Sequence, residues 1–258
     1  MIQTRNQTDD PDAPSFHPRA LLAGLLDLVF PPVCQLCGVR SHAGVCADCQ
    51  EQLPLLSPPW CQRCGRPFPP LATGGEVCAE CRGGGRVFDY CRSAGYYREP
   101  LREAVLALKY HRKTRLAAPL AELLAERLAA LRREADLPAP DCLVPVPLHW
   151  RRRWRRGFNQ SLLLCQELAK LLDRPPVEEL LVRTRATRPQ VGLKRTARIE
   201  NLRGAFALRR GACVEGRNVV LVDDVMTTGA TVNECAKMLK KAKCATVVCL
   251  TAARQVTE

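Results

Sequence analysis

The sequence lacks an apolar run long enough to cross a bilayer. Its most apolar early segment, LLAGLLDLVF at residues 21–30, has only ten residues and carries Asp27, whereas a membrane-spanning helix needs about 20 apolar residues. It also lacks the pattern of a secretory signal, because residues 1–20 carry acidic residues and prolines and no positive region before an apolar stretch. We expect a disordered tail over residues 1–20, a short amphipathic helix over residues 21–30 and a cytoplasmic protein without a membrane span.

Acidic residues are few relative to basic ones. The 258 residues include 39 Lys and Arg against 26 Asp and Glu, which gives a net charge of +13. Strongly basic chains often meet nucleic acid or phosphorylated ligands, although a general richness in arginine would give the same charge. The hydrophobic content of 47% is that of a soluble globular protein.

Cysteine, in contrast, is abundant. Eight of the 15 cysteines form four C-x-x-C pairs. The pairs are Cys34 and Cys37, Cys46 and Cys49, Cys61 and Cys64, and Cys78 and Cys81. Each such pair presents two sulfurs from one tight turn, and four thiolates bind Zn²⁺ tetrahedrally. Glycine follows the first and third pairs directly, as in zinc knuckles.

These pairs predict structural zinc. The sequential assignment joins the first two pairs and then the last two, while a crossed arrangement stays open. Disulfides do not suit the reducing cytosol, and a redox C-x-x-C lacks its usual βαβ context here. All-cysteine sites leave no position for a catalytic water, so the zinc is expected to fold the module. The other seven cysteines are expected to be small core residues.

The remaining chain alternates between apolar runs and helical patterns. Proline-rich PLLSPPW separates the two halves of the cysteine module, and GGGR at residues 83–86 ends it. We therefore expect a short helix with a four-cysteine zinc-ribbon module over residues 21–86 and one main domain over residues 87–258. Expected strands lie at residues 88–97, 142–147, 205–208, 218–222 and 245–253, and expected helices lie within residues 100–134, 157–172 and 232–243. This alternation predicts a parallel sheet flanked by helices, an α/β fold.

The most specific motif is VVLVDDVMTTGAT, residues 219–231. Its aliphatic start predicts a buried parallel strand, and ligands in such sheets bind at the carboxyl ends of the strands. Gly229 permits close backbone approach to an anion, and the following helix N-terminus favours phosphate. The hydroxyl donors are Thr227, Thr228 and Thr231. A P-loop is excluded because no GK[ST] follows the strand.

Two carboxylates, Asp223 and Asp224, stand between this strand and the threonines. They can accept hydrogen bonds from sugar hydroxyls or orient water around Mg²⁺. A phosphate cradle beside acceptors for a diol describes a site for ribose 5-phosphate. The alternative is an ordinary strand–turn–helix in which one aspartate caps the helix.

Two basic segments precede the motif. Five of the six residues 151–156 are arginine, with Trp154 among them, and Gly157 and a helix follow. This run is a second candidate anion site, a solvated face, or a nucleic-acid patch on which Trp154 stacks a base. Residues 183–206 carry seven basic residues and Glu200 as the one acid, and are expected to be irregular.

The 219–231 motif resembles the phosphoribosyl pyrophosphate (PRPP) signature of type I phosphoribosyltransferases. Together with the cysteine pairs, LALKYHRK, VPVPLHWRRRWRRGFNQS and RTRATRPQVGLKRTARIENLRGAF, it makes about residues 21–254 similar to the ComF family, including GntX-like proteins. The resemblance implies a type I phosphoribosyltransferase fold behind a double zinc ribbon, and a link to natural transformation and DNA uptake.

The resemblance also implies site residues. Asp223 and Asp224 would hold the ribose hydroxyls as catalytic residues, with Mg²⁺ accompanying PRPP. The PRPP-binding set is Val222, Asp223, Asp224, Thr227, Thr228, Gly229, Ala230, Thr231, Lys109 and Arg156. Lys109 belongs to a recurrent LK[YF] element, with a helix-surface lysine as the alternative. The basic segment would close over PRPP and exclude water, or be a surface connection. Its residues of interest are Thr187, Gln190, Leu193, Arg198 and Asn201.

Two function classes stay open. One is a phosphoribosyltransferase with an unidentified acceptor, acting in DNA uptake or nucleotide salvage, although no nucleobase pocket is recognisable in the sequence. The other is a non-catalytic PRPP-fold protein that binds single-stranded DNA through its zinc module and Arg/Trp run. A DNA-uptake helicase or recombination proteins are candidate partners.

Overall fold

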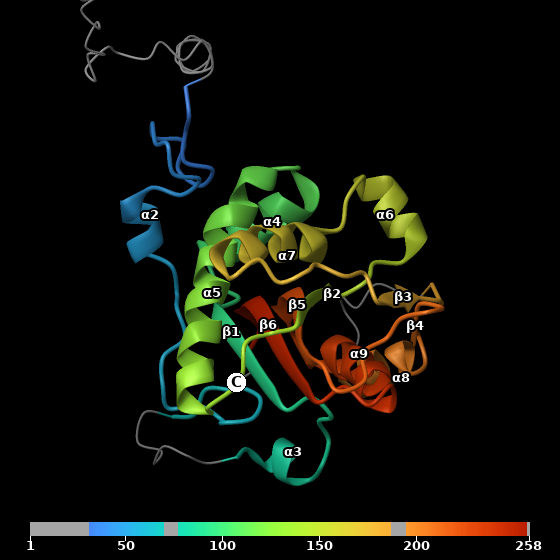
Figure 1. The fold of residues 1–258 in the computed structure, drawn as a ribbon. Helices are drawn as coiled ribbons and strands as arrows, with labels where there is room; N and C mark the ends of the chain where they lie inside the picture. The colour runs from blue at the N-terminus through green and yellow to red at the C-terminus, as the bar shows by residue number, and fades with distance from the viewer. Residues whose placement is uncertain (1–30, 70–76, 187–194, 257–258) are drawn as a thin grey trace, which may run out of the picture.

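The computed structural model describes residues 31–69, 77–186 and 195–256 (Figure 1). In chain order the elements are α2 (Ala47–Glu51), α3 (Ala79–Arg82), β1 (Tyr90–Tyr96), α4 (Leu101–Tyr110), the 3-10 helix η1 (Thr114–Leu116), α5 (Ala117–Glu134), β2 (Cys142–Pro145), α6 (Trp150–Arg156), α7 (Gln160–Leu171), β3 (Leu181–Arg183), α8 (Arg195–Leu202), β4 (Phe206–Leu208), β5 (Asn218–Met226), α9 (Ala230–Lys241) and β6 (Thr246–Arg254). None of the helices in these residues has the length and apolar character that spanning a bilayer requires.

The main sheet is parallel, as predicted. Its strands are ordered β1-β6-β5-β2, and each neighbouring pair runs in the same direction. The central strands β5 and β6 are buried along nearly their whole length, which explains their almost continuous apolar sequences. Parallel strands bring their carboxyl ends to one edge of the sheet, where ligands bind in such folds.

Helices cover both faces of the sheet. Val220 and Val222 of β5 pack in the core cluster that contains the buried leucines of α5 and α7. Val219 and Leu221 point the other way, into the cluster that contains the apolar face of α9. Figure 1 shows α5 to the left of the sheet and α9 to its lower right. The predicted α/β architecture, a parallel sheet flanked by helices, is therefore confirmed.

Three expected elements differ from the prediction. The basic run at residues 151–156, for which the sequence predicted no helix, forms helix α6, which ends at Gly157 with a left-handed φ of 86°. A new helix, α7, then starts after Asn159, whose side chain accepts a hydrogen bond from the Ser161 N–H. The basic segment expected to be irregular contains α8. The predicted strand at residues 205–208 forms β4, which pairs antiparallel with β3 outside the main sheet.

Some predictions fall outside the described residues. These are the tail and the short helix over residues 1–30, and Thr187, Gln190 and Leu193 in the basic segment. Arg198 lies in α8 without a described side chain. Asn201 lies near the end of α8, where its carbonyl accepts a hydrogen bond of 3.2 Å from the Arg185 guanidinium.

Candidate functional site

A cavity of about 770 Å³ lies at the carboxyl edge of the parallel sheet. All four strands contribute to its lining through residues at or just beyond their ends. These are Tyr97 after β1, Val146 after β2, Asp223 and Asp224 in β5, and Gln255 after β6. The fold thus gathers the two predicted carboxylates into the one place where ligands bind in open parallel sheets.

The two carboxylates have different surroundings. Oδ1 of Asp223 accepts hydrogen bonds from the Ser161 hydroxyl at 3.1 Å and from the Asp224 N–H at 2.9 Å. Oδ1 of Asp224 pairs with Nζ of Lys109 at 2.8 Å. Its Oδ2 is buried and has no hydrogen-bond partner among the described residues. Asp223 is therefore held by the protein, while Oδ2 of Asp224, a residue that lines the cavity, is left without a donor.

Electrostatics separates these groups further. Burial, and then the neighbouring Asp224, raise the pKa of Asp223 to about 7. Burial alone would lower the pKa of Lys109, but the carboxylates of Asp224 and Asp223 outweigh it and raise that pKa. Lys109 is thus kept positively charged near neutral pH by its two carboxylate neighbours.

The titration of Asp223 predicts a pH dependence of stability. The pKa of Asp223 is raised from 3.8 to about 7 on folding. Between these values the folded state holds a proton that the unfolded state has released, so the free energy of unfolding falls as pH rises. In the wild type we expect the free energy of unfolding to fall by about 2–4 kcal/mol between about pH 4 and pH 7. In Asp223→Asn this fall should be absent. Chemical denaturation of both proteins across this range measures the effect, and parallel profiles would contradict it.

The threonine loop begins helix α9. Gly229 is its N-cap, with a left-handed φ of 73° that favours glycine. The Thr228 hydroxyl accepts a hydrogen bond of 3.4 Å from the Ala230 N–H. Thr227 and Thr231 line the cavity, while the predicted Val222 is fully buried in the core beneath it. Two of the three predicted hydroxyl donors therefore lie where an anion at the α9 N-terminus would bind.

The rest of the lining is strongly cationic. Among the described residues it contains seven basic side chains against the two carboxylates. They are Arg102, Lys109, Arg112, Arg152, Arg155, Arg156 and Arg183. The guanidinium of Arg156 donates to the Gln160 side chain and lies 5.2 Å from the Tyr110 ring centroid. The charge balance favours a ligand with several negative charges over a neutral one.

Sequence reasoning missed several of these residues. Arg102 and Arg112 come from α4 and the turn after it, and Arg183 ends β3. Their spacing carries no motif, because the tertiary fold alone brings them to the cavity. The position of Ser161 in the first turn of a helix could be predicted, since Asn-Gln-Ser after Gly157 is a typical helix start. Only part of the predicted arginine run faces the site, as Arg153 pairs instead with Glu179 at 2.9 Å.

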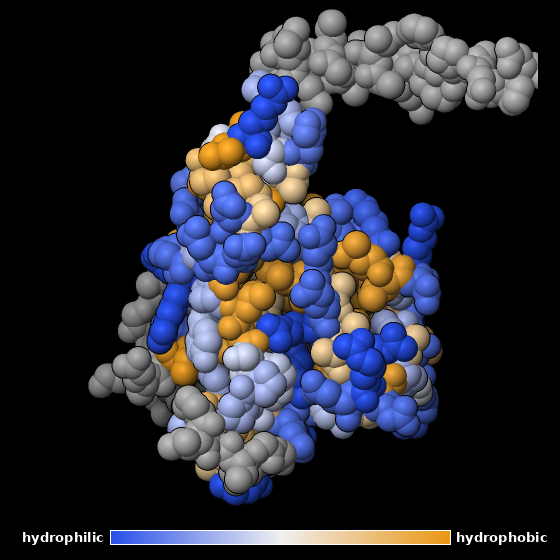
Figure 2. Space-filling view, turned by 90° about the vertical axis from the view of Figure 1, so that its left-hand side faces the viewer, coloured by the Kyte–Doolittle hydropathy of each residue, from blue (hydrophilic) through white to orange (hydrophobic). Residues whose placement is uncertain are grey.

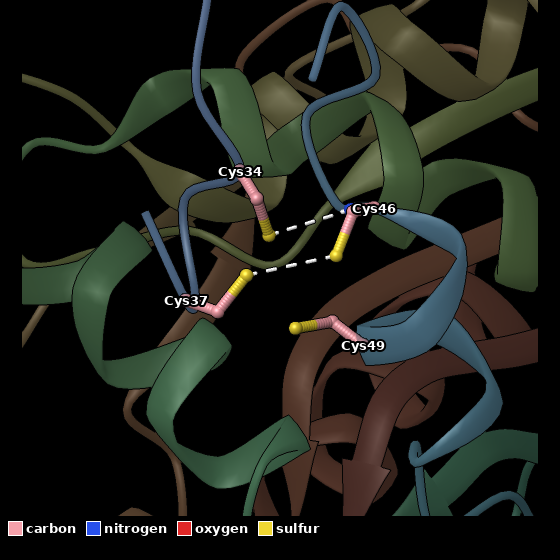
Figure 3. Close-up of side chains that lie close together, drawn as sticks. All are labelled: Cys34, Cys37, Cys46 and Cys49. Carbon is pink, nitrogen blue, oxygen red and sulfur yellow. Dashed lines mark hydrogen bonds between the residues drawn. The ribbon is translucent and has the colours of Figure 1, made fainter. Parts of the chain in front are cut away.

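The eight paired cysteines form two compact groups. Cys34, Cys37, Cys46 and Cys49 make the first group, with their sulfur atoms pointing toward one another (Figure 3). Cys61, Cys64, Cys78 and Cys81 make the second group, and within each group the sulfurs lie within 4.8 Å of one another. This is the sequential grouping of the pairs.

The geometry of both groups fits zinc. Four sulfurs at about 2.3 Å from a tetrahedral ion lie about 3.8 Å apart. Sulfur–sulfur distances of 3.6 Å for Cys37–Cys46 and 3.7 Å for Cys64–Cys78 agree with that value. Backbone N–H groups of Cys64 and Cys78 also donate to the Cys61 sulfur, at 3.4 Å and 3.3 Å. Such donors stabilise the thiolate form that binds a metal.

The groups differ in burial. All four sulfur ligands of the second group are buried in the α9-side core, whereas Cys37 of the first group is exposed. In the space-filling view the segment around the first group projects from the rest of the protein (Figure 2). Of the seven remaining cysteines, six are buried as predicted, but Cys213 is exposed and is not a core residue.

Comparisons with known proteins agree with both parts of the chain. A model of the double zinc ribbon domain matches residues 25–82, and one of the phosphoribosyl transferase domain matches residues 159–257. The chain is 39% identical over 226 residues to the DNA utilization protein YhgH of Salmonella typhi, covering 85% of this chain and 96% of that protein. It is 36% identical over 199 residues to competence protein F of Haemophilus influenzae, covering 77% and 85%. With competence protein ComFC of Bacillus subtilis it shares 30% identity over 200 residues, covering 70% and 78%.

Proposed function

The chain belongs to the ComF family, with a double zinc ribbon followed by a phosphoribosyl transferase domain, and from this premise we propose that its cavity binds Mg·PRPP and transfers the phosphoribosyl group. The observation that carries the proposal is the unpartnered Oδ2 of Asp224, because Asp224 lines a cationic cavity beside the threonine loop. An acceptor for a sugar hydroxyl next to an anion-binding helix N-terminus matches a ribose 5-phosphate.

Each part of the cavity has a role in this proposal. Asp224 accepts from a ribose hydroxyl, and Asp223 supports it from its fixed position. Thr227 and Thr231 at the start of α9 hold the 5-phosphate. The three arginines of α6 that line the cavity, with Lys109 nearby, attract the pyrophosphate. Mg²⁺ bound with PRPP would neutralise part of the pyrophosphate charge, and carboxylate and phosphate oxygens are the ligands it prefers.

The transfer itself needs little covalent chemistry from the protein. The bond between ribose C1 and the pyrophosphate oxygen breaks, and its electron pair leaves with pyrophosphate. A nucleophile on the opposite face forms the new bond to C1 and releases a proton. The carboxylates lower the energy of the positive charge that develops at C1, so catalysis is positioning plus electrostatics.

The direct test is pyrophosphate release from PRPP in the presence of a panel of bases, amines and nucleic acids. We expect release that depends on one class of acceptor and disappears in Asp224→Asn. Asp141→Asn is the matched control, because Asp141 caps the opposite end of β5 by accepting from the Asn218 N–H at 2.6 Å. If the protein binds PRPP but releases no pyrophosphate with any acceptor, the proposed transfer is contradicted and the proposed binding site stands.

A second function, binding of single-stranded DNA, is favoured by the surface of α6. Trp150 and Trp154 are 65% and 86% exposed, one helical turn apart, among exposed arginines. The Arg151 guanidinium lies 5.2 Å from the Trp150 ring centroid. Exposed aromatic rings beside cations are the usual platform for stacking bases of a single strand. The competence and DNA utilization proteins among the relatives support a role of this kind.

This surface gives a separate prediction. Trp154→Ala should weaken single-stranded DNA binding by about tenfold, as one lost stacking contact costs about 1–3 kcal/mol. Arg151→Ala should reduce the salt slope by about 0.7, the value for one phosphate contact to a single strand. Fluorescence anisotropy at several salt concentrations measures both, with the exposed Leu171→Ala of α7 as the control. Equal affinities and slopes for all variants would assign DNA binding to another surface.

A further inference from the structure

Arg86 lies where the second cysteine group meets the threonine loop. Its side chain is only 7% exposed. Its Nη2 donates to the Thr228 carbonyl at 2.6 Å and also pairs with Glu80 Oε1 at 2.7 Å. Glu80 lies in α3, between the metal-ligating Cys78 and Cys81. One guanidinium thus connects the second cysteine group to the loop that begins α9.

The loop is shaped to receive this guanidinium. A Cβ atom at Gly229 would lie 2.5 Å from Nη1 of Arg86 and 3.1 Å from its Cζ. Glycine is therefore favoured at position 229 for two reasons, its positive φ and the close approach of Arg86 to its backbone. Any side chain at this position would displace the arginine from the loop.

The contact also sets the orientation of a peptide plane. In a trans peptide the C=O and N–H groups point in opposite directions. Because Arg86 holds the Thr228 carbonyl, the Gly229 N–H must point away from the arginine. A charged donor on the carbonyl also polarises the peptide and makes its N–H a stronger donor. The arginine therefore fixes one N–H of the loop without needing to touch the ligand.

Neighbouring contacts hold the same segment in place. The Asn233 side chain of α9 accepts from the Val87 N–H at 2.7 Å and donates to the Gly85 carbonyl at 3.3 Å. Arg63, inside the third cysteine pair, donates to the Arg86 carbonyl at 3.0 Å. The segment is thus tied to the second cysteine group on one side and to the first turns of α9 on the other.

We propose that Arg86 is a positioning residue that fixes the anion loop and couples its geometry to the second cysteine group. Zinc bound by this group would immobilise Cys78 and Cys81, and with them Glu80, which orients Arg86. The effect of Arg86 on ligand binding rests on the proposed function, in which the loop binds the phosphate of PRPP. The loop's dependence on Arg86 does not require any ligand.

Hydrogen exchange tests the ligand-independent part. Arg86→Gln should speed amide exchange of residues 227–231 at least several-fold, while exchange in β6 stays unchanged. Arg92→Gln is the matched control, because buried Arg92 donates to the Gln62 carbonyl of the same cysteine group at 2.8 Å and does not contact the loop. If the amides of β6 also exchange faster, Arg86→Gln has destabilised the whole domain. Arg86→Lys is then tested in its place, since lysine keeps the charge but cannot bridge Thr228 and Glu80. Unchanged exchange at residues 227–231 in the folded variants would overturn the proposal.

Titration with PRPP tests the coupling to binding. Arg86→Gln should weaken PRPP binding about tenfold, as expected for one lost charge-assisted contact, while Arg92→Gln binds as the wild type does. Glu80→Gln should give an intermediate loss, and the double variant should bind no worse than Arg86→Gln if both act along one path. Additive losses would overturn the coupling. A wild-type protein that fails to bind PRPP would contradict the proposed function instead, leaving the exchange result to decide the role of Arg86.

Discussion

Replacing Asp224 by asparagine is expected to weaken Mg·PRPP binding by about 10- to 100-fold, with the fold intact. Asparagine removes a charge-assisted acceptor for a ribose hydroxyl and leaves the partly buried Lys109 without its ion-pair partner at 2.8 Å. Losing a hydrogen bond to a charged group costs about 1.5–3 kcal/mol, and each 1.4 kcal/mol is a tenfold change in affinity. Replacing Asp223 as well should abolish measurable binding.

The design separates binding from folding. Calorimetry gives the affinity, and thermal unfolding shows whether the variant is native. Asp141→Asn carries the same chemical change at the other end of β5 and should bind PRPP normally. Lys109→Met serves as the reciprocal variant, because it removes the partner of Asp224 while leaving the carboxylate. Unchanged PRPP affinity in Asp224→Asn would contradict the assignment of the cavity.

Removing one ligand from the second cysteine group is expected to lower the melting temperature far more than removing one from the first. Cys81 is 3% exposed and packs in the α9-side core, whereas Cys37 is exposed. Structural zinc contributes its binding free energy to folding. A loss of about 3 kcal/mol or more would lower the melting temperature of a chain this size by roughly 6–12 °C.

Zinc analysis gives the independent readout. The wild type should hold about two zinc ions per chain, one for each group of four cysteines. Cys81→Ser and Cys37→Ser should each lose one of these ions, yet only Cys81→Ser should unfold early. The buried non-ligand Cys235→Ser controls for the substitution itself. Equal melting temperatures for the two ligand variants would show that the second group does not hold the core together.

The site was predictable to the extent that it is local in sequence. The 219–231 motif contains a strand, two carboxylates and a helix start in one continuous piece, so its place at the sheet edge follows from the pattern alone. The C-x-x-C spacing likewise defines each pair of zinc ligands. The division of labour between Asp223 and Asp224 was not predictable, because it depends on Ser161 and Lys109, which come from distant helices.

The remaining differences have similar physical causes. The arginine run carries no apolar periodicity, so nothing in the pattern indicated helix α6. GGGR is predicted only to end the cysteine module, yet its arginine contacts Thr228, which lies 142 residues further along the chain. Such contacts depend on the packed tertiary structure, and a single sequence does not encode them as a spacing.

The central claim is that the cavity at the carboxyl edge of the sheet binds PRPP, and isothermal titration of Mg·PRPP into the zinc-loaded chain tests it most directly. We predict saturable binding at a single class of site, lost in Asp224→Asn and kept in Asp141→Asn. No saturable heat from a folded, zinc-loaded wild-type protein, or equal heats from all three proteins, would contradict it.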